Sequence, residues 1–61
     1  MTVKVAKEIV DGNYGALGIN LSFCFTDKRD YVRKEETEEA LQKIEEMRIV
    51  LEAYLNGELE E

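Results

Sequence analysis

The chain has no histidine, no proline, no tryptophan and a single cysteine among its 61 residues. Without histidine it cannot form a histidine-based metal site or a histidine-assisted nucleophile. The one cysteine, Cys24, excludes a disulfide within the chain, and a lone thiol usually packs as a small apolar side chain. These absences disfavour most classes of enzyme. We therefore expect a protein that works without catalysis and without a cofactor.

The small size of the chain limits it to one domain, residues 1–61, with a mass of 7.0 kDa. A core of this size seldom supplies more than about 3 to 5 kcal/mol, and neither disulfides nor a histidine-bound metal can supplement it here. Self-association is the remaining remedy, so we expect a dimer or tetramer. No apolar run approaches the length of a membrane helix, and no signal peptide is recognisable, so we expect a cytoplasmic protein without a membrane partner.

Charge is distributed unevenly along the chain. The net charge is -6, from eight basic and fourteen acidic residues. Residues 1–34 carry six basic and four acidic side chains, whereas residues 35–61 carry two basic side chains and ten glutamates. Such an acidic chain is disfavoured as a protein that binds nucleic acid mainly through contacts with its phosphates. The glutamate-rich second half is instead typical of a solvated helix face.

The first half of the chain carries two segments with strand character. From Leu17 to Phe25 apolar and polar residues alternate, which predicts a strand at about 17–26. Segment 2–10 is rich in β-branched residues and predicts a second strand, although a helix through Val3, Ala6 and either Ile9 or Val10 is also compatible with it. The glycine-rich residues 11–16 would form the turn of a β-hairpin.

The second half predicts one long amphipathic helix at about 28–56, followed by an acidic tail at 57–61. The helix could begin near Asp27 or only at Thr37, and Asn56-Gly57 is a typical end. One stripe along it is expected to cover the hairpin: Ala40, Leu41, Ile44, Met47, Leu51, Tyr54 and Leu55. The predicted fold class is therefore α+β, a β-hairpin followed by one helix and completed by oligomerisation.

Two sets of residues are candidates for contacts outside the domain. Ile49, Val50 and Ala53 project from the side of the predicted helix opposite Ile44, so we expect them to form the oligomer interface. Tyr14 and Asn13 lie in the predicted turn. An exposed aromatic side chain on a turn is a typical anchor for a partner, so we expect this pair to contact another protein.

A basic cluster supplies an alternative function. Its members surround Tyr31 at the predicted junction of strand and helix: Lys28, Arg29, Arg33 and Lys34. Basic side chains beside an exposed aromatic suit single-stranded nucleic acid. A purely structural alternative is that Tyr31 caps the core, while nearby aspartates offset part of the positive charge.

The order of a hairpin with an Asn13-Tyr14-Gly15 tip, the segment 17–23 and a glutamate-rich helix resembles short accessory proteins of phages and other mobile elements. The resemblance implies action by binding, often as an inhibitor of a host complex or an aid to nucleic acid handling. We therefore expect a small, acidic, non-enzymatic, homo-oligomeric binding protein, a phage-type inhibitor or modulator of a host macromolecular complex. The alternative is a nucleic acid-binding accessory protein that uses the basic cluster.

Overall fold

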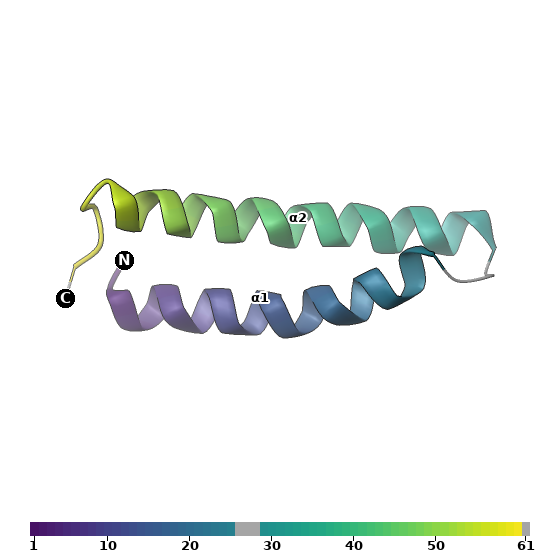
Figure 1. The fold of residues 1–61 in the computed structure, drawn as a ribbon, viewed down its shortest axis with the longest axis horizontal. Coiled ribbons are helices and arrows are strands. Elements are labelled where there is room, and N and C mark those ends of the chain that lie inside the picture. The colour runs from purple at the N-terminus through teal and green to yellow at the C-terminus, as the bar shows by residue number, and fades with distance from the viewer. Residues whose placement is uncertain (26–28, 61) are drawn as a thin grey trace.

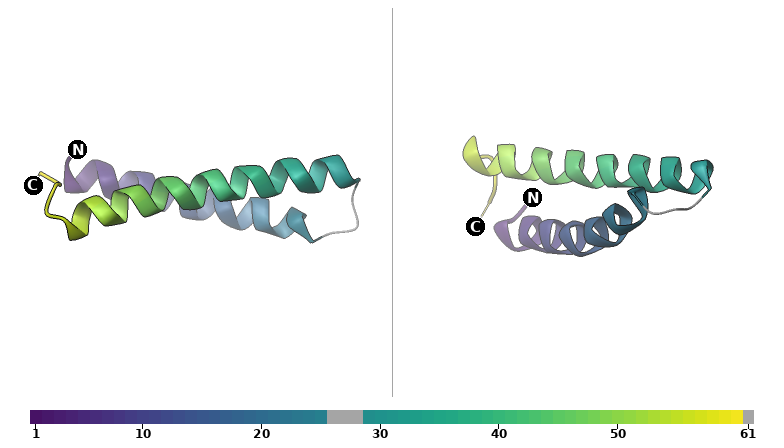
Figure 2. Two further views of the ribbon diagram at one scale, coloured as in Figure 1. Left: turned by 90° about the horizontal axis from the view of Figure 1, so that it is seen from above. Right: turned by 45° about the vertical axis from the view of Figure 1, so that its right-hand side comes forward.

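The chain folds as two long helices. A computed structural model describes residues 1–25 and 29–60, with α1 at Val3–Cys24 and α2 at Asp30–Leu55. The helices run antiparallel, and both termini lie at the same end (Figure 1). Seen from above, they cross at a shallow angle (Figure 2). The molecule measures 44 × 16 × 12 Å and is therefore an elongated helical hairpin with a single layer of contact between its helices.

The predicted α+β fold is wrong. Segments 2–10 and 17–26, expected as strands, and segment 11–16, expected as their turn, contribute to one continuous helix, α1 at Val3–Cys24. The part of the chain that the structure describes contains no strand, only one isolated bridge between Thr2 and Glu60. The β-hairpin and its aromatic tip therefore do not exist.

The helical character of α1 follows from a spacing of alternately four and three residues. This spacing keeps side chains on one side of a helix that packs against another. The residues with this spacing are half-buried or buried: Ala6, Val10, Asn13, Leu17, Asn20 and Cys24. We call the line along which the two helices meet the seam. Two seam positions of α1 are asparagines, so the helical pattern of apolar residues is interrupted in the sequence. The alternation of apolar and polar residues after Leu17 is the more regular pattern, and it predicts a strand.

The second helix lies within the predicted range 28–56, but it packs through a different side than expected. Its seam residues are Glu36, Ala40, Lys43, Met47 and Val50. Five members of the predicted core stripe are exposed instead, namely Leu41, Ile44, Leu51, Tyr54 and Leu55. The apolar core of the described residues consists only of Ala6, Ala40 and Val50, so the hairpin buries few large side chains.

The helix ends are closed by local hydrogen bonds. The Thr2 hydroxyl accepts from the Val5 amide at 3.2 Å and caps α1. At the end of α2, the Gly57 amide donates to the Tyr54 carbonyl and the Glu58 amide to the Ala53 carbonyl, with Gly57 at φ 70°. This pattern is a Schellman motif, which favours glycine because of its positive φ. The predicted stop at Asn56-Gly57 is therefore confirmed.

The C-terminal segment also returns to the start of α1. The Val3 amide donates to the Glu60 carbonyl at 2.8 Å, and the Glu60 amide donates to the Met1 carbonyl at 2.9 Å. These bonds join the two ends of the described chain beside the first turn of α1.

Replacing Gly15 by alanine tests whether segment 11–16, which the sequence predicts as a turn, is helical. A Cβ at Gly15 has no neighbour within 4 Å, and glycine inside a helix costs about 0.5 to 1 kcal/mol relative to alanine. We expect Gly15→Ala to raise the melting temperature by several degrees in thermal unfolding followed by circular dichroism. The matched control Gly57→Ala should lower it, because of the positive φ there. Destabilisation by Gly15→Ala would favour a turn at this position.

Candidate functional site

One side of the hairpin carries a broad apolar surface. On each helix it occupies the same flank of the seam, and these flanks adjoin in the antiparallel pair because both turn in the same sense from the line of contact. We call it the apolar face. It comprises the exposed residues Val3 and Leu21 of α1 with Leu41, Ile44, Leu51 and Leu55 of α2, and the half-buried seam residues Val10 and Leu17 form its inner edge. A shallow groove of about 330 Å³ between the helices is lined by Val3, Val10 and Leu51, which places both flanks on one surface.

A single cation lies within the α2 part of the apolar face. The Arg48 guanidinium is held by two carboxylates, with Nη1 2.6 Å from an oxygen of Glu52 and Nε 3.0 Å from an oxygen of Glu45. The hydrogen bonds from Arg48 lower the pKa of Glu45, so any stability from this pair is lost as pH falls through that depressed value. Because its charge is paired on its own helix, Arg48 can leave its aliphatic stem on the apolar face.

The seam contains polar contacts that fix the register of the helices. Asn13 Nδ2 donates to Glu46 Oε2 at 2.8 Å. Asn20 Nδ2 donates to Glu36 Oε2 at 2.6 Å and to Glu39 Oε2 at 2.9 Å. Asn20 is only 5% exposed, and its Oδ1 has no hydrogen-bond partner. These bonds place each asparagine level with its partner on α2 and disfavour a slip of one helix along the other.

The three residues predicted for the oligomer interface have separate environments. Val50 is buried in the seam, Ala53 is half-buried, and Ile49 is exposed on the flank opposite the apolar face. They do not form one outward surface, because Val50 faces α1. The sequence pattern identifies the exposed residues of the apolar face but predicts that they belong to the core. The signal missed on α1 is the seven-residue spacing of Val3, Val10 and Leu17.

The predicted pair Tyr14 and Asn13 is also divided. Tyr14 is 74% exposed on the outside of α1, toward the edge of the apolar face, whereas Asn13 is committed to its bond with Glu46 in the seam. The tyrosine therefore lies on a rigid helix rather than on a turn. Its availability for a partner remains a prediction.

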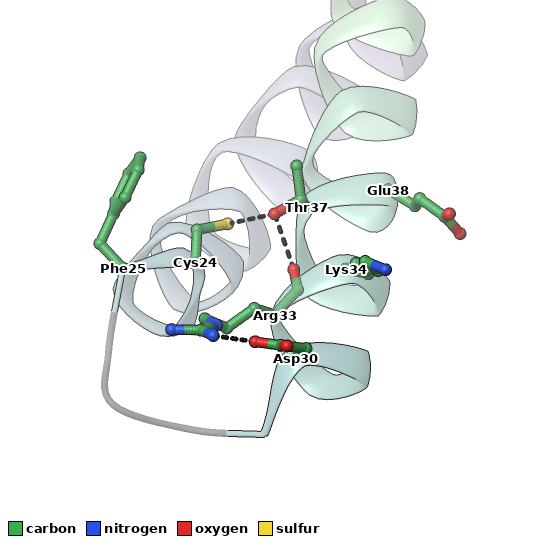
Figure 3. Close-up of a pocket in the computed structure, with 7 residues that line it drawn as sticks. All are labelled: Cys24, Phe25, Asp30, Arg33, Lys34, Thr37 and Glu38. Carbon is green, nitrogen blue, oxygen red and sulfur yellow. Dashed lines mark hydrogen bonds and ion pairs between the residues drawn. The ribbon is translucent and has the colours of Figure 1, made fainter.

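The basic cluster lies at the end of the hairpin opposite the termini. An open hollow of about 660 Å³ lies there, and Arg33, Lys34, Cys24 and Phe25 are among the residues that line it (Figure 3). Arg33 forms an ion pair with Asp30, which offsets one of the positive charges. Arg29 precedes the first residue of α2, and Lys28 lies outside the described residues. The cluster is therefore less basic than its sequence indicates.

Cys24 lines the same hollow, and its sulfur contacts both helices. Its thiol donates to the Asn20 carbonyl oxygen at 3.3 Å, and its sulfur lies 3.3 Å from Thr37 Oγ1 (Figure 3). The Thr37 hydroxyl donates to the Arg33 carbonyl at 2.7 Å. These contacts join the end of α1 to the first turns of α2.

Within residues 1–25 and 29–60, no three metal-ligating side chains gather into a group that would hold an ion. In the same residues neither helix has the length and hydropathy needed to cross a bilayer. Comparisons with protein-family models, curated proteins and solved structures found no match to this chain. The apolar face is therefore the main candidate for a functional surface, on its own geometry.

Replacing Asn20 by leucine tests the role of the polar seam. The buried amide leaves one oxygen unpaired, which costs about 1 to 3 kcal/mol, while Glu36 and Glu39 can turn to water. We expect Asn20→Leu to raise the free energy of unfolding by about 1 kcal/mol or more in urea titrations. Asn13→Leu is the matched control, with a smaller gain because Asn13 is only half-buried. A loss of stability in Asn20→Leu would mean that the amide bonds outweigh the unpaired oxygen.

Proposed function

We propose that the protein is a non-enzymatic binding protein that assembles with itself through the apolar face and contacts a further macromolecule with its outer surfaces. The observation that carries this proposal is the exposure of four large aliphatic side chains on one flank of α2, namely Leu41, Ile44, Leu51 and Leu55. A continuous apolar patch on a small protein is typical of an interface.

The exposed area of the chain supports self-assembly quantitatively. A compact monomer of 7.0 kDa has an accessible surface of about 4,000 Å² by the usual scaling with mass, whereas this chain exposes 4824 Å². The excess of about 800 Å² equals the area that one partner buries in a standard interface. The radius of gyration, 13.9 Å, also exceeds the value of about 10 Å expected for a compact chain of this length.

The outer surface of α2 supports contact with a second macromolecule. The helix carries eight acidic and four basic residues, so its solvent side suits a partner with a basic surface. The β-hairpin on which the resemblance to phage accessory proteins rests is replaced by α1, so the charge of α2 is the support for this second contact. The nucleic acid alternative has less support, because Arg33 is already paired with Asp30.

Light scattering after gel filtration tests the assembly. We expect a mass of about 14 kDa, twice that of the chain, at micromolar concentration. A mass equal to that of one chain over the whole range would contradict the proposal.

Two substitutions with nearly equal exposure test which face assembles. Leu51 on the apolar face is 53% exposed, and Ile49 on the opposite flank is 55% exposed. We expect Leu51→Glu to weaken association at least about a hundredfold, because both copies would bury a charge. Ile49→Glu should leave association unchanged. Circular dichroism would establish that both variants stay helical, and dissociation by Ile49→Glu alone would transfer the interface to the originally predicted side.

A further inference from the structure

The two helices of the hairpin differ in charge, and this difference bears on how two copies can meet. Helix α1 carries two lysines and two acidic residues, a net charge of zero. Helix α2 carries four basic and eight acidic residues, a net charge of -4. In any assembly through the apolar face, the arrangement of the two copies therefore determines whether their acidic α2 helices lie side by side or apart.

We propose that the second copy covers the apolar face about a two-fold axis parallel to the helices, so that α1 of each copy packs against α2 of its partner. This inference rests on the proposed self-assembly and specifies its geometry. The result is a four-helix bundle in which every neighbouring pair of helices is antiparallel. Each acidic helix then has two neutral neighbours, and the two copies of α2 lie across a diagonal.

The other two-fold arrangement is disfavoured by charge. With the axis perpendicular to the helices, α1 would pack on the partner's α1 and α2 on the partner's α2. Two helices with a net charge of -4 each would then be adjacent, and like charges side by side oppose association. In the proposed arrangement the neutral α1 instead separates the two acidic helices.

The register of the hairpin determines which residues would meet. The bond from Asn13 to Glu46 and those from Asn20 to Glu36 and Glu39 fix the levels of the two helices. Tyr14, one residue beyond Asn13, is therefore level with residues 43–45 of α2. Since the axis is parallel to the helices, this level is kept between copies, and Tyr14 would meet the partner's Ile44. Both side chains are exposed in the single chain.

A second copy can meet the area that a standard interface needs. An equal share of about 800 Å² from each chain makes a standard interface of about 1,600 Å². A copy of the same chain brings an equally large apolar face, and it brings a neutral helix to each acidic one. Because the contact is two-fold, every apolar residue on the face is covered in both copies at once.

Disulfide trapping distinguishes the two arrangements. In a Cys24→Ser background, Tyr14→Cys and Ile44→Cys chains are prepared separately and also mixed in equal amounts to exchange subunits under reduction. On oxidation, we expect the mixture to form crosslinked heterodimer at least about tenfold faster than either chain alone, because a disulfide needs Cα atoms about 4.4 to 6.8 Å apart. Mass spectrometry would identify the species. A mixture of Tyr14→Cys with Ile49→Cys is the matched control and should not crosslink.

The remaining outcomes each overturn the inference in a recognisable way. Rapid self-crosslinking of Tyr14→Cys alone and of Ile44→Cys alone would establish the arrangement with α1 on α1. A protein that is dimeric by light scattering but crosslinks in neither combination would place the interface elsewhere. A protein that is monomeric by light scattering would overturn the proposed function itself.

Discussion

The structure depends on how little two helices can bury between them. A helical hairpin has one line of contact, and here several positions on that line hold small or polar side chains. Ala6 and Ala40 let the backbones approach, while Asn20 takes up buried space that an aliphatic side chain would otherwise fill. Burial of apolar surface is the dominant favourable term in folding. With so small a core, many large aliphatic side chains remain exposed, and those on one flank form the apolar face.

The asparagines in the seam lower the stability of the hairpin but define the register of its helices. Asparagines in the contact line of paired helices are less stabilising than leucine but tolerate fewer alignments. The bonds from Asn13 to Glu46 and from Asn20 to Glu36 and Glu39 join the helices at two separate levels. A stable register matters for an interface, because the apolar residues of α1 and α2 form a common face only when the helices keep their levels.

The sequence was sufficient for the second helix and insufficient for the first. The C-terminal half has a long amphipathic pattern and a glycine end signal, and both are found at Asp30–Leu55 and Gly57. In the first half, three glycines and the alternation after Leu17 favoured a β-hairpin, whereas the helical spacing was hidden by Asn13 and Asn20. Without proline, nothing in that half prevents a continuous helix.

The candidate site shows the complementary difficulty. Periodicity identified Leu41, Ile44 and Leu51 as one stripe, but it could not determine whether the stripe faces the same chain or another. That distinction depends on which side of α2 offers the closest approach to α1. The small side chain of Ala40 and the polar bonds of the asparagines decide it, and these contacts exist only after the helices pair.

The bonds of Glu60 to Met1 and Val3 give the molecule a direction. Both chain ends leave from one pole, and the residues around Arg33 lie at the other (Figure 1). In the proposed bundle the axis preserves this direction, so four chain ends would gather at one pole and two basic clusters at the other. The two ends of such an assembly are different. Anything attached to either terminus, whether a label, a surface or a neighbouring protein, would lie at one pole of the bundle and leave the pole around Arg33 uncovered.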